Sequence, residues 1–272
     1  MPASGEKYFF VGSLAKGIRI MELLAEHKHL TVSGVARLMN TNRAGGHRFL
    51  ATLRELGYVE KDEDDRYRLT FKVFELGMQV ANRFEIRQLA RPLMQELSLV
   101  SGETVNLGHF DGTGILHVDK IDSREILRMD SPIGSRAPAY CTALGKAALA
   151  FLPVEEFERY LSRVTLKAHG PNTITTRKLF RQTIAAIREK GYAMDDEEMS
   201  AGLRCVGAPV FDHTDRAPYA ISISGPSLRM TPQRTAEILP LVIKVCHQLS
   251  QKMGSTVFKS PPPIYPAGQK TI

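Results

Sequence analysis

The sequence predicts a two-domain protein of the α+β class, and three observations carry this prediction. Its 272 residues exceed what one small core needs. Residues 11–70 show helical periodicity that ends in a short hairpin, whereas residues 85–253 mix helical stretches with strand-like alternation. We therefore expect a flexible N-terminus (1–10), a first domain (11–70), a linker helix (71–84), a second domain (85–253) and a disordered tail (254–272).

Composition places the chain among ordinary soluble proteins. Apolar residues make up 43%, enough for a sizeable core, and the net charge of +7 weakly favours a polyanionic partner. Three scattered cysteines suit neither a disulfide framework nor a zinc site, which is typical of the reducing cytoplasm. We see no signal peptide and no apolar run near the roughly 18 residues of a membrane span. We expect a cytoplasmic protein with no membrane contact, no metal and no other cofactor.

The first domain begins with two helices. Apolar residues recur at helical spacing in the first helix, so we expect one buried stripe. This stripe consists of Leu14, Ile18, Met21, Leu24 and Ala25. Thr31 or Ser33 can cap a shorter second helix by accepting a hydrogen bond from a backbone amide. The apolar residues of the second helix are Val35, Ala36, Leu38 and Met39.

A third helix follows the break at residues 39–42 and ends at Gly57, a residue type that favours helix ends. Its apolar face consists of Phe49, Leu50, Leu53 and Leu56. Residues 58–60 and 67–69 read as two short strands around the acidic loop 61–66, which predicts a hairpin. Three helices followed by a hairpin indicate a winged helix-turn-helix.

The third helix carries only positive charge in its first half, since no acidic residue lies between Arg37 and Arg54. In a helix-turn-helix, the first residues of the second helix of the motif enter the major groove, among the phosphates. The predicted contacts to double-stranded DNA are Arg37, Asn42, Arg43, Ala44, Gly45, His47 and Arg48, with Lys61 and Arg66 from the hairpin. The simpler alternative is a three-helix domain with a solvated basic face, but the order of the elements favours DNA.

The second domain mixes helices and strands. Polar and apolar residues alternate at 104–110 and 114–121 around the turn Asp111–Gly114, which predicts a hairpin. Further strands are expected at 126–131, 203–211 and 218–224. Helices are expected at 71–81, 86–100, 143–151, 155–161, 178–190 and 232–253.

Several blocks of sequence resemble the IclR family of bacterial transcription regulators. They are SLAKGIRIMELLAEHKHLTVSGVARLMN, HRFLATLRELGYVEKDEDDRYRLT, YCTALGKAALA, GYAMDDEEMSAGLRCVGAPVFD and AISISGP. The resemblance covers residues 11–253. It implies a winged helix-turn-helix joined by a linker helix to an α/β, GAF/PAS-like effector-binding domain with an antiparallel sheet. FKVFELG, KIDSREILRMDSPIG and NTIT look closest to the sugar-acid branch, which includes the ketodeoxygluconate repressor.

The recognition helix departs from the family pattern. Where members usually carry a Lys-Ser-Thr or similar hydroxyl run, this chain has Asn42, Arg43, Ala44, Gly45 and Gly46. Each glycine costs a helix roughly 1 kcal/mol relative to alanine. Either the helix is locally irregular until DNA orders it, or the operator differs from the family's usual sequence.

The resemblance also implies a ligand cavity in the second domain. Residues 142–145 open a helix, so backbone amides there can hold a carboxylate. Ser222 and Ser224 are two apart on a predicted strand, so both hydroxyls point to one side. The effector contacts so implied are Ala143, Leu144, Asp195, Leu203, Cys205, Ser222 and Ser224. Taken singly, the cysteine reads as a buried thiol, the serines as edge-strand residues and the aspartate as a solvated acid.

Two other kinds of site are disfavoured. Cys205 would be the nucleophile of a Cys-dependent hydrolase, but only His213 lies near it in sequence and no strand-to-helix elbow presents it. His109, His117, Asp119 and Asp122 lie across a hairpin without the spacing of metal ligands.

We therefore expect a DNA-binding repressor of a catabolic operon for sugar acids or related carboxylates, controlled by a small carboxylate effector. It would bind a palindromic operator as a homodimer, and dimers pairing into tetramers remain an alternative. An activator of an aromatic- or keto-acid operon is the second interpretation.

Overall fold

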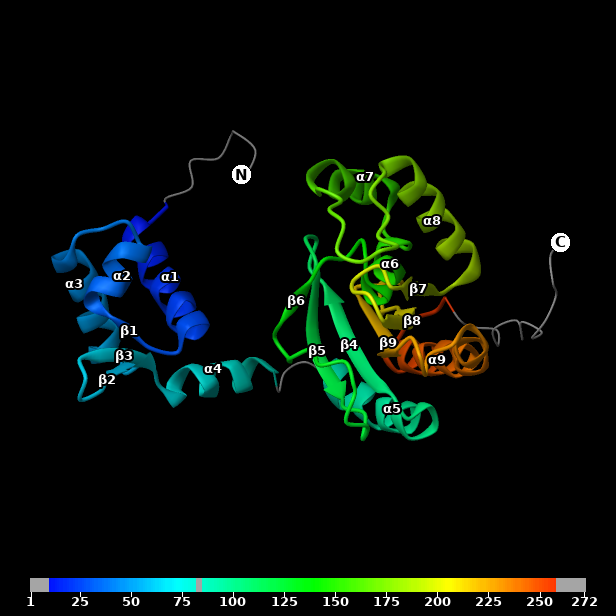
Figure 1. Cartoon of the computed structure of the whole chain (residues 1–272), viewed down its shortest axis with the longest axis horizontal. Helices are drawn as coiled ribbons and strands as arrows, with labels where there is room; N and C mark the ends of the chain where they lie inside the picture. Colours follow the sequence, from blue (N-terminus) through cyan, green and yellow to red (C-terminus); the bar gives the residue numbers. More distant parts are fainter. Residues whose placement is uncertain (1–9, 82–84, 258–272) are drawn as a thin grey trace. The chain divides into compact units, whose positions relative to one another are not determined.

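The chain divides into two compact units, residues 1–84 and 85–272, and each is described by itself. The structure, a computed structural model, describes residues 10–81 and 85–257 (Figure 1). The flexible N-terminus expected at 1–10, apart from Phe10, and the tail expected after residue 257 lie outside these residues.

The first unit contains three helices and a small sheet. In chain order these are α1 (Gly12–His27), β1 (Leu30–Thr31), α2 (Val32–Leu38), α3 (Arg43–Glu55), β2 (Val59–Lys61) and β3 (Arg66–Leu69). The three strands are antiparallel in the order β1-β3-β2, so the predicted hairpin is present and gains one short strand that the sequence did not indicate. Thr31 and Asn42 cap α2 and α3, and Gly57 follows α3 with a φ of +76°.

The core of the first unit corrects the prediction for α1. That helix buries Ile20, Leu23 and Leu24, whereas Leu14 and Ile18 are 63% and 51% exposed. At 3.6 residues per turn, the apolar residues of α1 form two separate faces, and only one packs on α3 and β3. Leu38 and Leu56, also expected to be apolar contacts, are largely exposed as well.

A single helix, α4 (Phe71–Ala81), follows the hairpin. Its boundaries match the helix expected at 71–81. Phe71, Phe74 and Leu76 on this helix are exposed, so α4 leaves apolar surface uncovered within the first unit.

The second unit is built on a six-stranded antiparallel sheet of order β6-β5-β4-β9-β8-β7. Its elements are α5 (Glu85–Ser101), β4 (Thr104–Phe110), β5 (Ile115–Ile121), β6 (Arg136–Ala137), α6 (Ala143–Leu149), α7 (Val154–Arg163), α8 (Arg177–Lys190), β7 (Ala193–Asp196), β8 (Leu203–Val210), β9 (Tyr219–Pro226) and α9 (Pro232–Lys252). The short strands β6 and β7 were not predicted.

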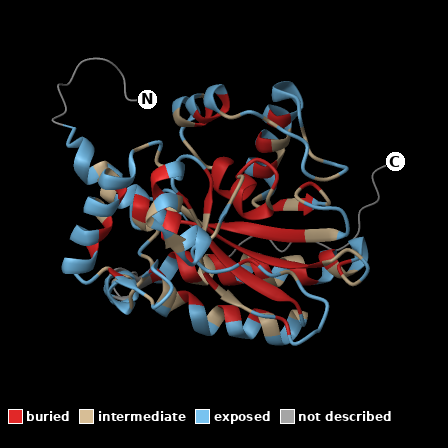
Figure 2. Cartoon of the chain, turned by 60° about the vertical axis from the view of Figure 1, so that its left-hand side comes forward, coloured by how far each residue is buried: buried red, intermediate tan, exposed pale blue. Residues whose placement is uncertain are grey.

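Helices cover both faces of this sheet. Helices α5 and α9 pack on one face around Met94, Val206 and Val242. Helix α6 packs on the other face with α8 behind it, around Leu144, Leu149 and Phe180. Figure 2 shows the buried residues concentrated in the long strands and in α6. Fold class and sheet type therefore agree with the prediction.

The prediction of a strand at residues 126–131 is wrong. This stretch is an irregular loop, and Ile126 and Leu127 are exposed rather than packed. Its apolar residues alternate as in a strand, but Thr104 and Arg229 hold its backbone through side chains instead of a neighbouring strand. The loop covers one side of a cavity described below.

The chain just after α9 is ordered by Asp215. Its carboxylate accepts hydrogen bonds from Ser255 Oγ and from the backbone nitrogen of Thr256, at 2.8 and 2.7 Å. The disorder expected from Gly254 onward therefore does not include residues 254–257.

Candidate nucleic-acid interface and ligand cavity

Helix α3 presents its basic side chains to solvent. Arg43, His47 and Arg48 are exposed, and no hydrogen bond or ion pair joins their side chains to another of the described residues. Arg43 and His47 are four residues apart and so lie on one side of the helix. Together with Ala44, Lys61 and residues 31–33 they line a hollow between α2, α3 and the hairpin. Arg37 is exposed on α2 but does not line this hollow.

Local packing explains why glycines occupy positions 45 and 46 at the start of α3. Asn42 Oδ1 accepts the Gly45 backbone amide at 2.7 Å, and a Cβ on Gly45 would approach that same oxygen to 3.0 Å. Gly46 is buried against α2, where a Cβ would lie 3.6 Å from the Cβ of Ala36. Helix α3 is continuous from Arg43 to Glu55, so the local irregularity considered above is absent.

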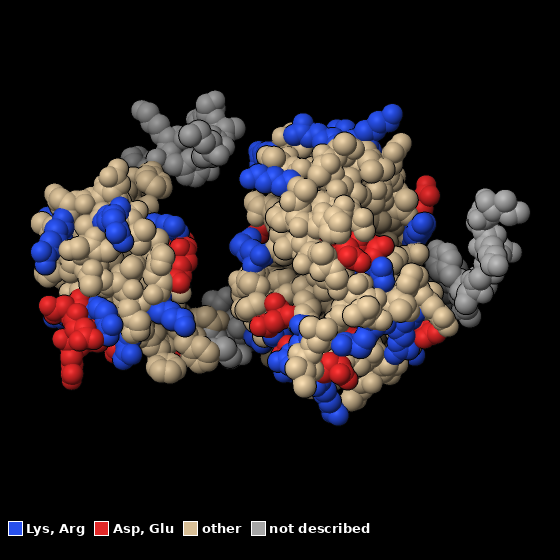
Figure 3. Space-filling model, in the orientation of Figure 1, with Lys and Arg blue, Asp and Glu red and all other residues tan. Residues whose placement is uncertain are grey.

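The hairpin loop pairs its own basic residues with acids. Asp65 contacts Lys61, while Asp62 and Asp64 bind Arg66 at 3.1 and 2.6 Å. Figure 3 shows these acids as a red cluster at one end of the unit. Exposed ion pairs contribute little to stability, so phosphates can compete for both cations.

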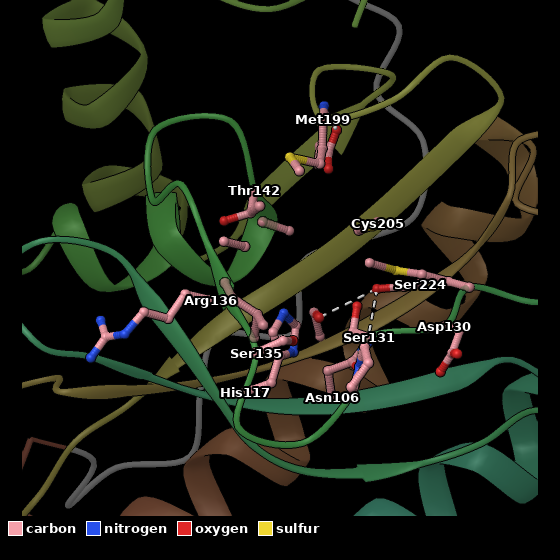
Figure 4. A pocket seen from close by; sticks show the side chains of 17 residues that line it. Asn106, His117, Asp130, Ser131, Ser135, Arg136, Thr142, Met199, Cys205 and Ser224 are labelled. Carbon is pink, nitrogen blue, oxygen red and sulfur yellow. Dashed lines mark hydrogen bonds between the residues drawn. The ribbon is translucent and has the colours of Figure 1, made fainter. Parts of the chain in front are cut away.

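The second unit contains a cavity of about 210 Å³ between the sheet, α6 and the loop 129–137 (Figure 4). A volume below that of drug-sized pockets suits a small metabolite. Its polar lining residues include Asn106, His117, Thr142, Asp195, Ser222 and Ser224.

Strand register assembles the polar floor of this cavity. Ser224 on β9 lies opposite Cys205 on β8, and Cys205 lies opposite Asp195 on β7. Ser222, two residues from Ser224, lies opposite Asn106 on β4. The Asn106 amide donates to Ser224 Oγ at 3.3 Å, and the two serine hydroxyls are 3.5 Å apart. Residues from four adjacent strands thus converge on one buried patch.

Glycines let α6 approach the sheet closely. A Cβ on Gly108 of β4 would lie 3.0 Å from Leu144, and a Cβ on Gly207 of β8 would lie 3.5 Å from the backbone of Ala143. A Cβ on Gly145 itself would lie 2.2 Å from the carbonyl oxygen of Ala139, which excludes a side chain there. Thr142 caps the helix by accepting the Gly145 amide at 3.1 Å. The first residues of α6 are therefore fixed against the cavity.

Asp195 is a buried carboxyl with raised proton affinity. Its Oδ1 accepts the backbone amides of Glu198 and Met199 at 2.8 and 3.2 Å. Burial nevertheless raises the pKa of the Asp195 carboxyl to about 6, because the charged form loses solvation and these amides only partly offset that loss. Its ionisation therefore falls between about pH 5 and 7, above the range of an exposed aspartate.

A buried ion pair supports the turn after β7. Lys146 of α6 is 2% exposed and contacts Glu198 Oε1, while Glu198 Oε2 has no hydrogen-bond partner in the described part of the chain. Glu198 also donates its amide to Asp195. The pair therefore links α6 to the acid at the cavity floor.

Several hydrogen bonds hold the loop over the cavity. His117 donates its backbone amide to Ser135 at 2.9 Å and accepts that of Gly134 at 2.8 Å. Thr104 Oγ1 donates to the carbonyl of Met129 at 3.3 Å, and Lys120 pairs with Asp130 at 2.7 Å. Strands β4 and β5 thus carry both the loop and part of the cavity wall.

Comparison with known proteins decides the family. The IclR helix-turn-helix domain matches residues 13–63, and the bacterial transcriptional regulator IclR C-terminal domain matches residues 78–251. The chain is a member of the IclR family.

Individual relatives agree with this family and with its KdgR branch. HTH-type transcriptional regulator KdgR of Escherichia coli (strain K12) is 35% identical over 245 residues, 90% of this chain and 93% of KdgR. Transcriptional repressor IclR of the same organism is 31% identical over 258 residues, 93% and 92% of the two chains. The crystal structure of the Thermotoga maritima IclR matches with a TM-score of 0.75 and 33% identity, over 90% of this chain and 99% of that one. This IclR-family chain is a DNA-binding transcriptional regulator with a C-terminal IclR effector domain.

A more distant structure shares the fold. It is an IclR homolog from Microbacterium hydrocarbonoxydans complexed with 4-hydroxybenzoate, with a TM-score of 0.79, 20% identity and coverage of 89% and 98%.

Six of the seven effector positions expected for this IclR-family chain line the cavity, namely Ala143, Leu144, Asp195, Cys205, Ser222 and Ser224. Leu203 does not line it. Although Leu203 shares a strand face with Cys205, it lies opposite Pro226, where β7 has already ended. The cavity ends before that point.

Sequence reasoning missed Asn106, His117, Met199 and the covering loop. Asn106 and His117 are polar residues inside buried strands, and this was the available signal. His117 was considered only as a metal ligand. In the resolved ranges 10–81 and 85–257, no three His, Cys, Asp or Glu side chains come together as a metal site, and no helix is long and apolar enough to cross a membrane.

The cysteines of this IclR-family chain are all buried and free. Burial raises the pKa of the Cys205 thiol well above its usual range, and the nearby Asp195 carboxylate raises it further. Burial likewise raises the pKa of the Cys141 thiol to about 12. Both side chains are therefore thiols at neutral pH, whereas nucleophilic attack requires a thiolate.

Proposed function

We propose that this chain is a homodimeric repressor of a catabolic operon for sugar acids or related carboxylates, and that a small carboxylate in the cavity controls its DNA binding. The observation that carries this proposal is the buried polar floor of the cavity, in a chain whose relatives are transcriptional regulators. Of the proteins it resembles, KdgR is named a transcriptional regulator and IclR a transcriptional repressor.

Hydrogen-bond donors favour an acid as the ligand. Ser222 and Ser224 are each 2% exposed, and their hydroxyls face the cavity. Ala143 and Leu144 begin α6 beside them, where backbone amides are not engaged within the helix. A carboxylate accepts from both kinds of donor and replaces the water they would otherwise bind. The homolog complexed with 4-hydroxybenzoate also holds a carboxylate.

Exposed apolar faces support the homodimer. Helix α1 and the residues before it expose Phe10, Val11, Leu14 and Ile18, and α4 exposes Phe71, Phe74 and Leu76. Large exposed apolar side chains gathered on two helices are typical of surfaces that associate. Two copies would present two α3 helices to a palindromic site in cytoplasmic DNA, with half-sites about one helical turn, or a multiple of it, apart.

Within the first unit, we propose DNA contacts by Arg37, Asn42, Arg43, Ala44, Gly45, His47 and Arg48, with Lys61 and Arg66 from the hairpin. The exposed and unpaired state of Arg43, His47 and Arg48 supports this assignment.

The test is a mobility-shift titration of full-length protein on the DNA upstream of its own gene. We expect a sequence-specific complex whose stability changes when a panel of sugar acids, short 2-oxo acids and 4-hydroxybenzoate is added. A complex equally stable on shuffled DNA would contradict the regulator. A specific complex that no acid alters would contradict the carboxylate effector alone.

An activator of an aromatic- or keto-acid operon is the second candidate, because 4-hydroxybenzoate occupies a structure of the same fold. Expression of a reporter gene fused to the upstream DNA distinguishes repression from activation. Deleting the regulator raises expression under a repressor and abolishes effector-induced expression under an activator.

We further propose that the chain has no catalytic activity. Cys205→Ser should leave operator binding unchanged, since Cys205 belongs to the cavity and not to the first unit. Turnover of any acid from the panel by wild type, and its loss in this variant, would instead support a Cys-dependent hydrolase.

A further inference from the structure

Two cavity residues carry polar atoms that nothing in the described chain satisfies. Asn106 on β4 is 1% exposed and His117 on β5 is 4% exposed. The Asn106 amide nitrogen binds Ser224, but its Oδ1 has no partner among the residues described. His117 Nδ1 is also buried without a partner there. A buried polar atom without a hydrogen-bond partner lowers the stability of the fold unless a group in the cavity forms a hydrogen bond with it.

The two side chains can reach one small molecule. His117 lies opposite Gly108 on β4, which is two residues from Asn106 on the same strand. The β-bulge in β5 lies between these two positions and brings His117 to the same side of the sheet as Asn106. Both line the same cavity, and Figure 4 shows them on its β4 and β5 side. The serine hydroxyls lie on β9, the next strand.

The two atoms without hydrogen-bond partners indicate which chemical group of a ligand could bind them. Asn106 Oδ1 accepts hydrogen bonds and cannot donate, so a carboxylate or carbonyl oxygen cannot satisfy it. Burial lowers the pKa of His117, with nearby Lys120 acting in the same direction, so its ring is neutral at pH 7. A neutral imidazole nitrogen either accepts or donates, depending on the tautomer. A hydroxyl group both donates and accepts, and therefore fits either case.

We propose that Asn106 and His117 form a hydroxyl-reading subsite that makes the cavity selective for hydroxylated carboxylic acids over acids of the same length without hydroxyls. The carboxylate lies toward Ser222, Ser224 and the start of α6, and a hydroxyl farther along the ligand binds Asn106 and His117. This assignment rests on the proposed function, since it presupposes a carboxylate effector.

The test is isothermal titration of full-length protein with matched pairs of acids. The pairs are 3-hydroxypropanoate with propanoate, 4-hydroxy-2-oxobutanoate with 2-oxobutanoate, and 2-oxo-3-deoxygluconate with 2-oxohexanoate. We expect the hydroxylated member to bind roughly tenfold or more tightly in at least one pair, because the other leaves both polar atoms unpaired. Asn106→Leu and His117→Phe should remove this preference while still binding the hydroxyl-free acid.

His109→Phe is the matched control. His109 is a half-buried histidine on the neighbouring strand β4, but it lies against Tyr219 and does not line the cavity. Its replacement should keep the preference. Equal binding within every pair, or a preference that survives in Asn106→Leu and His117→Phe, would overturn the subsite alone. Binding of no acid in any pair would overturn the carboxylate effector as well.

Discussion

Asp195 on β7 lies directly opposite Cys205 on β8, so a buried carboxyl and a buried thiol share the floor of the cavity. Cys205 in turn lies opposite Ser224 on β9. Burial and the neighbouring acid both raise the pKa of the Cys205 thiol, which keeps the thiol protonated near neutral pH. The pKa of about 6 for Asp195 places its ionisation close to neutral pH.

Asp195 should make stability depend on pH. Burial raises its pKa from 3.8 to about 6, so the folded state holds the proton more tightly than the unfolded state. The free energy of unfolding should therefore fall as pH rises from about 4 through 6, by roughly 2–3 kcal/mol. Asp195→Asn keeps an oxygen for the two amides and removes the ionisation. Its stability relative to wild type, from urea unfolding at several pH values, should increase through this window.

Asp196→Asn is the control for this series, since Asp196 is the exposed neighbour on the same strand. A gain for Asp195→Asn that is equal at pH 4.5 and pH 8 would contradict the role assigned to burial.

The Lys146–Glu198 pair should be costly to break on one side. Lys146→Met leaves Glu198 buried without its cation, and we expect the free energy of unfolding to fall by about 3–5 kcal/mol. Lys146→Met with Glu198→Leu should recover most of this loss, because no uncompensated charge remains. Arg181→Ala breaks an exposed pair with Glu158 and should cost at most about 1 kcal/mol. Additive losses in the double variant would rule out the compensation.

Arg43 and Arg48 should contribute to DNA affinity without contributing to folding. Both are exposed and unpaired in the described structure, so Arg43→Ala and Arg48→Ala should leave the melting temperature unchanged. Each lost phosphate contact should flatten the plot of log affinity against log salt by about 0.9. Fluorescence anisotropy on operator DNA measures this slope. Arg54→Ala, at the far end of α3, should keep the wild-type slope, and the same slope in all three variants would refute the assigned orientation of the helix.

The hairpin acids should weaken DNA binding. Asp64→Asn with Asp65→Asn frees Lys61 and leaves Arg66 with only one of its two acids, Asp62, so we expect affinity to rise roughly three- to tenfold and to become more salt-dependent. Glu22→Gln removes an acid paired with Arg19 on α1 and tests the effect of net charge alone. If Glu22→Gln gave the same gain per charge removed, the hairpin would have no specific part.

Much of the cavity floor was predictable because strand alternation is local. Ser222 and Ser224 share a face whatever the rest of the chain does, and the start of α6 follows from its capping residue Thr142. The position of His117 was harder to predict from the sequence. A β-bulge in β5 shifts the pairing by one residue, so His117 faces the cavity while Asp119 binds Arg91 of α5. Simple alternation would place both on one side.

The error in the apolar face predicted for α1 has a different cause. Periodicity identifies an apolar face but does not say whether that face packs on its own domain or on another chain. Leu14 and Ile18 satisfy the helical pattern and remain exposed, whereas Ile20 and Leu23 form the core. The loop at 126–131 was misassigned similarly, since only tertiary contacts decide that it covers a cavity instead of joining the sheet.

Operator affinity with and without the effector tests the central claim most directly. Labelled upstream DNA is titrated with full-length protein, first alone and then with a saturating acid from the panel. We predict that the acid changes DNA affinity by about 5- to 150-fold, and that Ser222→Ala with Ser224→Ala binds DNA like wild type but loses this response. An acid that binds the protein while leaving DNA affinity unchanged would contradict control through the cavity, as would an undiminished response in the double variant.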